Sequence, residues 1–417
     1  MKNAIKKTIL ALLLCLLTLP GWAQFEGMQL SPQAKISLIT CSSGQDLYAI
    51  FGHSAVRVND PASGLDIVFN YGTFDFDEPN FYLKFIRGKL NYKLSAAYFS
   101  DFVNSYARDN RSVYEQQLNL TPDETQQYWT FLTTNYLPEN RFYLYDFFFD
   151  NCATRIRDGL EATFPNQLTF NISQFDEDMS FRNLIDLYLV PQPWSDFGID
   201  LALGARIDEE ATPYQYMFLP DYLEKGIANA TLSKDGQTKP LTLQRQVVFE
   251  REPMPFDAGW LTPQVVFWIF LLVVIAITAR DVIKRQRSRV FDMVLFFVVG
   301  LLGILLFLLW VATDHQAAAY NFNLLWALPT HAIAAFFVGR NVLANWMRKY
   351  MLVTALLATV ALVGWPLWPQ MYHAAFLPIM LLLVLRALYA VWFSRKARAI
   401  VTTPSIEQTH EPRANSN

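Results

Sequence analysis

The chain has few of the residues that bind metal ions and no excess of basic ones. Its 417 residues include three cysteines and five histidines, and the formal net charge is −3. Residues 24–258 contain one histidine, His53, and two cysteines, Cys41 and Cys152, which are far apart in the sequence. We expect no metal site, because zinc ligands usually come in closely spaced pairs, and no cofactor. Nucleic acid is not expected as a partner either, because phosphate binding requires a basic stripe.

The N-terminus has the three parts of a secretory signal peptide. Lysines precede an apolar stretch from Ile9 to Leu19, and Pro20 and Gly21 lead to Ala23. We expect cleavage after Ala23, with residues 1–23 as the signal; an uncleaved anchor is the alternative. A lipoprotein signal is not expected, because Leu14 precedes Cys15, where a small residue is required.

The second half of the chain is the more apolar one, and residues 259–396 are expected to form an all-α transmembrane domain of five helices. Each apolar stretch spans or nearly spans a bilayer at ~20 residues per crossing. The third contains Pro329, so a four-span or re-entrant arrangement is the alternative. The stretches cover residues 260–279, 291–313, 323–338, 351–368 and 371–393.

Basic residues between these stretches set the expected orientation. They gather at 280–289, 340–349 and 386–398, and the positive-inside rule places such loops in the cytoplasm. The segment before residue 260 then lies outside, in agreement with the N-terminal signal. We therefore expect a bacterial inner-membrane protein with residues 24–258 in the periplasm and a disordered cytoplasmic tail at 397–417.

Asp314 and His315 fall at the outer ends of the predicted helices. Polar residues at such depths are costly in lipid and usually face a cavity or a partner. We expect these two residues to bind substrate at a lipid entrance. Ordinary solvation at the membrane interface, or hydrogen bonding between helices, is the alternative.

Residues 24–258 are expected to form one α+β domain, because strand-like and helix-like patterns come in separate runs. Residues 34–41 are β-prone, and residues 54–58 and 65–71 fit a hairpin around a turn at 59–64. Helices are expected at 100–106, 121–136 and 152–163. The second of these begins with Thr121, Pro122 and Glu124, which can form an N-terminal capping box.

The pairing of Cys152 with His53 suggests thiol acyl-transfer chemistry. Cys152 follows Asn151 and opens a predicted helix, where the helix dipole and unpaired backbone N–H groups lower a thiol pKa. The same N–H groups could hold the oxyanion of a tetrahedral intermediate. His53 begins a β-prone run, from which the imidazole could reach the sulfur and act as its base.

A third group should orient the imidazole of His53. Asn70 on the neighbouring strand is the first choice and Asp66 the second, and both depend on the register of the hairpin. Asp146 either supports the loop before Cys152 or is a surface carboxylate, and we favour the surface position.

A structural disulfide between Cys41 and Cys152 is the alternative role for the two thiols, because an exported domain meets an oxidising compartment. A domain of this size buries enough surface to fold without a bridge. A bridge would also leave the lone His53 beside Gly52 without a role, so the catalytic role is preferred.

Three motifs resemble those of Lnb-type lipoprotein N-acyltransferases: FGHSAVRV at 51–58, NYGTF at 70–74 and DNCAT at 150–154. The order of His, a polar residue and then Asn-Cys resembles circularly permuted papain-like enzymes such as lecithin:retinol acyltransferase. Some of those relatives carry a second His where this chain has Asn70. Residues 313–315 and 323–329 resemble the five-span membrane domain of some Lnb-like proteins, so the resemblance covers nearly the whole chain after residue 23.

The resemblance implies a permuted papain-like fold and a thiol acyltransferase. An acyl chain would pass from a glycerol ester of a diacylated lipoprotein, or from a membrane lipid, to the α-amine of the lipidated N-terminal cysteine. Cys152 would be the nucleophile, His53 the proton carrier and Asn70 the third residue. The residues of the matching motifs that we expect to bind substrate are Arg57, Tyr71 and Asn151.

Two other functions stay open. The same residues could belong to a thiol amidase or peptidase of cell-wall peptides, although such soluble targets need no more than one membrane anchor. The chain could also be a non-catalytic assembly or transport protein whose periplasmic domain binds lipid or protein.

Overall fold

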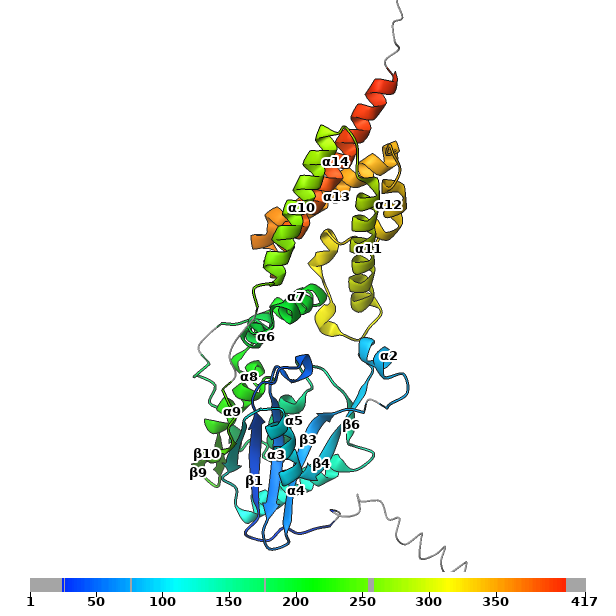
Figure 1. The fold of residues 1–417 in the computed structure, drawn as a ribbon. Helices are drawn as coiled ribbons and strands as arrows, with labels where there is room; N and C mark the ends of the chain where they lie inside the picture. The colour runs from blue at the N-terminus through cyan, green and yellow to red at the C-terminus, as the bar shows by residue number, and fades with distance from the viewer. Residues whose placement is uncertain (1–24, 26, 76, 176–177, 254–258, 403–417) are drawn as a thin grey trace, which may run out of the picture. The chain divides into compact units, whose positions relative to one another are not determined.

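The computed structural model describes residues 25, 27–75, 77–175, 178–253 and 259–402. The chain forms two compact units, which we describe separately (Figure 1). The first comprises Met1–Val190 with Glu210–Phe256, and the second comprises Pro191–Glu209 with Asp257–Asn417. The predicted signal at 1–23 lies outside the described residues. Of the predicted tail, residues 397–402 continue helix α14 (Phe376–Thr402), and the rest also lies outside the described residues.

A seven-stranded antiparallel sheet organises the first unit, in the strand order β10-β5-β1-β2-β3-β4-β6. The predicted hairpin of β2 and β3 is present, with Val56 opposite Phe69. β1 pairs with β2 up to Cys41 opposite His53, so β1 ends where β2 begins. The strands are β1 (Lys35–Cys41), β2 (His53–Asp60), β3 (Leu65–Thr73), β4 (Asn91–Tyr98), β5 (Val113–Leu118), β6 (Phe142–Leu144) and β10 (Thr242–Phe249).

Helices cover both faces of this sheet. On one face, Phe102 of α3 (Phe99–Arg108) packs in a cluster with Ile39 and Val68. On the other, Trp129 of α4 (Pro122–Tyr136) packs edge-on against Phe69 with 5.9 Å between ring centroids, and α5 (Cys152–Thr163) packs on β2 and β3. α4 begins with the predicted capping box. The expected α+β class is therefore confirmed.

Smaller elements complete the first unit. A three-stranded sheet has the order β7-β8-β9, and a short helix, α2, connects β3 to β4. The elements are η1 (Leu47–Ala49), α2 (Phe81–Ile86), β7 (Leu168–Thr169), α6 (Phe181–Leu189), α8 (Pro213–Tyr216), α9 (Pro220–Ala228), β8 (Thr231–Lys234) and β9 (Gln237–Pro240).

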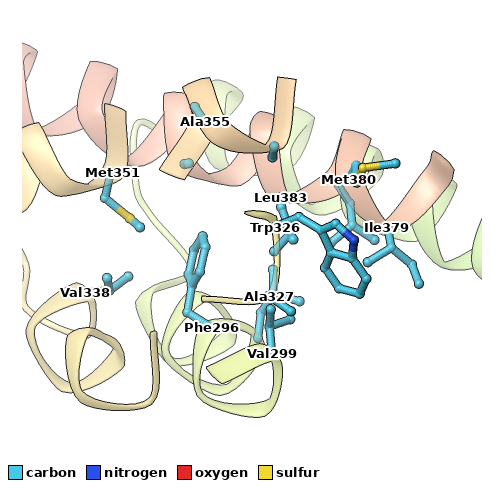
Figure 2. Packing of buried hydrophobic residues seen from close by; sticks show 14 of the residues in the cluster. Phe296, Val299, Trp326, Ala327, Val338, Met351, Ala355, Ile379, Met380 and Leu383 are labelled. Carbon is cyan, nitrogen blue, oxygen red and sulfur yellow. The ribbon is translucent and has the colours of Figure 1, made fainter. Parts of the chain in front are cut away.

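The second unit is helical, as expected, and four of its described helical stretches are long and apolar enough to cross a membrane. Their packed core includes Phe296, Trp326, Met351 and Met380, which come from neighbouring segments of the bundle (Figure 2). The four stretches are α10 (Pro263–Ile283), α11 (Arg289–Val311), Asn345–Leu367, which joins α13 (Asn345–Gly364) to η5 (Trp365–Leu367), and Phe376–Ala397 of α14.

The third expected helix is broken. After η3 (Gln316–Ala318), the chain forms η4 (Phe322–Leu325), passes Pro329 without helical structure and then forms α12 (His331–Val338). Eight residues of α-helix extend only about 12 Å, too little to cross a bilayer. The broken segment lies directly on α11, because a Cβ at Gly303 would overlap the backbone of Ala327 before α12, and a Cβ at Gly300 would overlap that of Ala332 in α12. The expected five regular helices are thus four, with one broken segment buried against α11.

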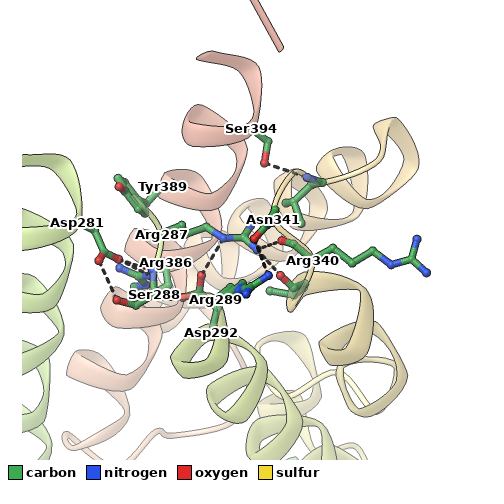
Figure 3. A network of polar contacts seen from close by, with 12 residues as sticks. Asp281, Arg287, Ser288, Arg289, Asp292, Arg340, Asn341, Arg386, Tyr389 and Ser394 are labelled. Atoms are coloured by element: carbon green, nitrogen blue, oxygen red, sulfur yellow. Dashed lines mark hydrogen bonds and ion pairs between the residues drawn. The ribbon is translucent and has the colours of Figure 1, made fainter. Parts of the chain in front are cut away.

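A buried ionic network joins three of the long helices (Figure 3). The Arg386 guanidinium of α14 donates to Asp292 of α11 at 2.7 Å and to Thr278 and Asp281 of α10 at 2.8 and 3.3 Å. Ser288 also donates to Asp281, at 2.7 Å. All three charged side chains are fully buried. Because charges are costly in lipid, this pairing is what allows them to lie within the bundle.

Residues 191–209 belong to the second unit rather than to the continuous 24–258 domain that the sequence predicts. They form α7 (Pro193–Ala202) and η2 (Ala205–Asp208). The Asn321 amide donates to the carbonyls of Leu201 (2.9 Å) and Ala202 (3.2 Å), and the Asn323 amide donates to that of Asp200 (3.3 Å). Both asparagines are buried and used in this packing.

Candidate active site

Cys152 is the first residue of α5, and Asn151 holds the turn that presents it. The Asn151 side-chain oxygen accepts hydrogen bonds from the N–H groups of Ala153 (2.8 Å) and Thr154 (2.9 Å). Its amide nitrogen donates to two backbone carbonyls, one of them that of Phe218 at 2.8 Å. The thiol is thereby fixed at the positive end of the helix dipole, with 7% of the Cys152 surface exposed.

His53 is held at the start of β2 by the backbone before it. Gly52 has φ +78°, and a Cβ there would lie 2.9 Å from the carbonyl oxygen of Cys41, so only glycine fits this position without strain. The imidazole lies parallel to the ring of Tyr106 on α3, with 6.3 Å between centroids and 14° between planes. Backbone geometry and ring packing together fix the position of His53.

Cys152, His53 and Asn70 meet at this point. The His53 Nε2 hydrogen bonds to the Asn70 side-chain oxygen, and the imidazole also hydrogen bonds to the Cys152 thiol. An amide oxygen only accepts, so Nε2 carries the hydrogen and Nδ1 is the nitrogen available to the sulfur. Asp66, the second choice, instead accepts from Arg57 at 2.8 and 2.9 Å.

The surroundings favour proton transfer from Cys152 to His53. Burial opposes the thiolate, but the His53 charge, its hydrogen bond and the N–H groups of Ser54 and Ala153 outweigh burial and lower the pKa of Cys152. Burial likewise opposes the imidazolium, but the Cys152 charge and the hydrogen bonds that the ring makes to Cys152 and Asn70 outweigh it and raise the pKa of His53. Both shifts favour a thiolate–imidazolium pair.

The expected oxyanion hole is only partly available. The N–H groups of Ala153 and Thr154, which the sequence offered for this role, already donate to Asn151. The capping that presents the thiol therefore consumes two of the first-turn donors. Among the described residues, the Cys152 N–H has no such acceptor and is the first-turn donor left for an oxyanion.

Tyr106 and Tyr145 lie at the site, and sequence reasoning missed them. Burial raises the pKa of Tyr106 well above its usual range. Burial, together with the Cys152 charge, does the same for Tyr145. A Cβ at Gly72 would lie 3.4 Å from the Tyr145 ring and 3.9 Å from the Cβ of Cys152. In a chain with 19 tyrosines, no local pattern marks these two.

Asp146 supports the loop before Cys152, contrary to the surface position that we favoured from the sequence. Its side chain accepts from the N–H groups of Phe148 (2.9 Å) and Phe149 (3.1 Å). Its backbone exchanges two hydrogen bonds with that of Asp150, at 2.9 and 3.1 Å. The carboxylate thus closes the loop that leads into α5.

A pocket of about 410 Å³ lies beside α5. Tyr71, predicted to bind substrate, is among the residues that line it, and so are Asp150 and Arg155, which form an ion pair. The Arg155 guanidinium lies over the Tyr143 ring at 4.0 Å. The pocket therefore offers both signs of charge and an aromatic wall next to the turn that carries the thiol.

The other residues predicted to bind substrate are engaged elsewhere. The Arg57 guanidinium pairs with Asp66 at 2.8 Å and Glu115 at 2.9 Å and covers the Phe99 ring at 3.5 Å. Asn151 uses its side chain to cap α5. Asp314 and His315 lie in the second unit, in the turn that follows α11. Binding by these residues stays a prediction.

Cys41 and Cys152 are both free and buried. The alternative of a structural disulfide between them is therefore not realised. Burial raises the pKa of the Cys41 thiol far above its usual value, which keeps it protonated and unreactive. The two thiols thus differ in pKa, which is raised for Cys41 and lowered for Cys152, and Cys152 is the one that can form a thiolate.

Two family models match the chain, one in its periplasmic part and one in its apolar part. Residues 27–186 match the model of the Lnb N-terminal periplasmic domain, and residues 255–398 match the model of the Lnb transmembrane domain. No curated protein and no solved structure matches the chain. The two models indicate a lipoprotein-modifying membrane protein with a periplasmic N-terminal domain. Through both of its domains, the chain belongs to the Lnb family.

Proposed function

We propose that the protein is a lipoprotein N-acyltransferase of the bacterial inner membrane that works through a thioester on Cys152. The observation that carries this proposal is the contact of Cys152 with an imidazole whose far nitrogen is held by Asn70. This arrangement supplies a nucleophile, a base and a group that orients the base. The matches to the Lnb family support a lipoprotein as the substrate.

In the first half-reaction, His53 Nδ1 takes the proton of Cys152, and the thiolate attacks the carbonyl carbon of a glycerol ester. The Cys152 N–H donates to the oxyanion of the tetrahedral intermediate. When the intermediate collapses, the C–O bond breaks and the His53 imidazolium gives its proton to the leaving glycerol oxygen. The products are a thioester on Cys152 and a free glycerol hydroxyl.

In the second half-reaction, the α-amine of the lipidated N-terminal cysteine attacks the thioester carbonyl. His53 takes a proton from the attacking nitrogen, and the C–S bond breaks to release the Cys152 thiolate. The released thiolate and the His53 imidazolium then form the resting ion pair again. The imidazole thus moves one proton in each half-reaction, which requires that its ring stay fixed by Asn70.

The test is mass spectrometry of the N-terminal lipopeptide of an endogenous lipoprotein, from cells with the intact protein and with Cys152→Ala. We expect an N-acylated amine with the intact protein and a free α-amine with the variant. The change at the glycerol in the first case identifies the acyl donor. Cys41→Ala is the matched control, because it removes the other buried thiol of the domain, and acylation should persist.

An unchanged lipopeptide in the Cys152→Ala cells would overturn the proposal that the protein is an N-acyltransferase. Cell-wall peptides that accumulate in the same cells would then indicate an amidase or peptidase. Full complementation by the variant would indicate a binding protein.

A further inference from the structure

Large apolar side chains are exposed around the end of the sheet at which Cys152 lies. β1 ends there, β2 begins there with His53, β3 ends there at Thr73, and the loops between them meet at this end. Leu144 belongs to it because it pairs with Asn91, the first residue of β4. We define the apolar rim as six of these residues, each between 52% and 75% exposed: Tyr48, Tyr82, Leu83, Ile86, Leu144 and Phe149.

α2 contributes half of the rim. Phe81 is buried with 8% exposure and anchors the helix, whereas Tyr82, Leu83 and Ile86 point away from the domain with more than half of their surface exposed. Lys84 lies among them and pairs with Glu78 at 2.6 Å. Soluble surfaces rarely expose contiguous apolar side chains, and those that do commonly mark a membrane or protein contact.

Aromatic contacts connect α2 to the thiol. Phe81 contacts Phe74 with 5.9 Å between ring centroids, Phe74 contacts Tyr92 at 5.4 Å, and Tyr92 stacks on Tyr145 at 4.5 Å. Tyr145 lies against Gly72, next to Cys152. The position of α2 is therefore tied to that of the catalytic turn through packed rings rather than through a flexible loop.

The bilayer is the surface that this rim can reach. β10 ends at Phe249 and the first long apolar helix begins at Pro263, so the connection extends at most about 50 Å even when fully stretched. Apolar side chains with a lysine and an arginine (Lys84, Arg87) among them have the composition of interfacial membrane anchors. The bilayer also holds the ester that the proposed reaction needs.

We propose that the apolar rim inserts into the interface of the bilayer that holds the chain's own helices, with α2 as its leading element. Cys152 then faces the lipid surface, and an acyl ester can reach the sulfur without passing through water. The functional role of this insertion rests on the proposed acyl transfer. The insertion itself can be measured whether or not the protein transfers acyl chains.

Insertion is measured with a nitroxide label on full-length Leu83→Cys protein in vesicles of phosphatidylethanolamine with a minority of phosphatidylglycerol. The labelled proteins also carry Cys152→Ala, because the reactive native thiol would take up the label, whereas Cys41 is buried; protein with Cys152→Ala alone gives the background. We expect the label to be accessible to oxygen and shielded from a water-soluble nickel complex. The control is Ala62→Cys, in the turn at the opposite end of the β2–β3 hairpin, which should be accessible to nickel.

Two outcomes would overturn the insertion. If the Leu83 label is as accessible to nickel as the Ala62 label, the rim lies in water. If the Leu83 label is shielded from both reagents, protein covers the rim, either the second unit or another copy of the chain.

The functional consequence is tested with the double variant Leu83→Asn with Ile86→Asn. We expect lipoprotein N-acylation in vesicles to fall by at least about tenfold, because two apolar side chains no longer enter the interface. Acylation of Cys152 by a soluble short-chain thioester should be unchanged. Leu243→Asn is the matched control, because it replaces an exposed leucine on β10 at the far edge of the same sheet, and both activities should persist.

The two readouts separate the two proposals. Normal lipoprotein acylation by the α2 double variant would overturn membrane docking and leave the transferase intact. Loss of the soluble reaction as well would mean that α2 acts on the catalytic turn rather than on the membrane. A wild-type protein whose Cys152 never forms a thioester would overturn the proposed function, whatever the nitroxide label reports.

Discussion

At the residue scale, the contact between His53 and Asn70 decides which imidazole nitrogen faces the thiol. The amide oxygen of Asn70 requires a hydrogen on Nε2, so neutral His53 presents the lone pair of Nδ1 to Cys152. Removal of this acceptor frees the ring to rotate and to adopt the other tautomer. The asparagine thus acts on the reaction through the histidine.

Asn70→Ala is expected to slow acylation of Cys152 by about 10²-fold, which is the size of a general-base contribution. Asn70→Asp should lose less, because a carboxylate also accepts from Nε2. The measurement is the single-turnover rate with a soluble thioester, and thermal unfolding of each variant reports the integrity of the fold. Equal rates for the two variants would show that the acceptor has no role.

The pH dependence of thiol reactivity follows from the two opposed pKa shifts. The pKa of Cys152 is lowered and that of His53 is raised. The thiolate–imidazolium pair therefore forms at a pH below 9, the ordinary pKa of a thiol, and persists up to the pH at which His53 loses its proton. Alkylation of Cys152 by iodoacetamide should therefore already be fast at neutral pH. In His53→Ala, only the N–H groups of Ser54 and Ala153 still oppose burial, and the alkylation profile should move to higher pH. Superimposable profiles would contradict the pairing.

Gly52 and Gly64 form a matched pair of left-handed glycines. Both have positive φ, +78° and +70°, but a Cβ at Gly52 would meet the Cys41 carbonyl at 2.9 Å, whereas a Cβ at Gly64 has no described atom within 4 Å. Each alanine should cost about 1 kcal/mol of stability through the backbone. Only Gly52→Ala should also lower the rate of Cys152 acylation, because it displaces the start of β2. A rate loss of the same size in Gly64→Ala would refute this explanation.

The central residues of the site could be predicted because they are rare. His53 is the only histidine of residues 24–258, and Cys152 stands at a recognisable helix start. Asn70 followed from the hairpin register. The use of Asn151 as a cap with all its hydrogen bonds inside the protein, and the nearness of Tyr145, depend on loops whose course no local pattern specifies.

At the element scale, the broken third span shows where apolar periodicity stops being informative. Residues 323–338 are apolar, and Pro329 indicated a break, but composition does not tell a short span from a buried irregular segment. Gly300 and Gly303 supply the missing information, because they let α12 and the backbone before it lie on α11. The contact between the broken segment and α11 depends on glycines of α11, so the sequence of the broken segment itself could not predict it.

The buried network around Arg386 is expected to hold α10, α11 and α14 together. Arg386→Met removes the closest cationic partner of the buried Asp292 and Asp281 and leaves Asp292 only Arg287 at 3.5 Å, which should cost about 3–5 kcal/mol. The double variant Arg386→Met with Asp292→Asn removes one of the stranded charges and should recover part of that loss. Thermal unfolding in detergent measures both variants. If the double variant is no more stable than Arg386→Met alone, the two charges do not act as a pair.

At the scale of the whole molecule, the order of a sheet-based unit and a helical unit was predictable, because charge and hydropathy change together near residue 258. The place of residues 191–209 was not. α7 resembles any short amphipathic helix, and its assignment to the second unit depends on Asn321 and Asn323, which are more than a hundred residues away.

Membrane orientation is tested with a membrane-impermeant maleimide on intact spheroplasts. A cysteine at Leu367, 85% exposed between α13 and α14, should be labelled from outside. A cysteine at Lys284, in the turn between α10 and α11, should be labelled only after permeabilisation, because the positive-inside rule predicts a cytoplasmic position for basic turns. The reverse pattern would invert the proposed topology and place the catalytic unit in the cytoplasm.

The return of residues 191–209 to the second unit also has a consequence in time. Leu201 leaves the ribosome 120 residues before Asn321, which binds its carbonyl. At about 5–20 residues per second, this gap is roughly 6–24 s. Over that period β10 is synthesised and the sheet can form, while Asn321 and Asn323, which bind the end of α7, have not yet been synthesised. The catalytic unit can therefore mature before the segment that interrupts it has found its place.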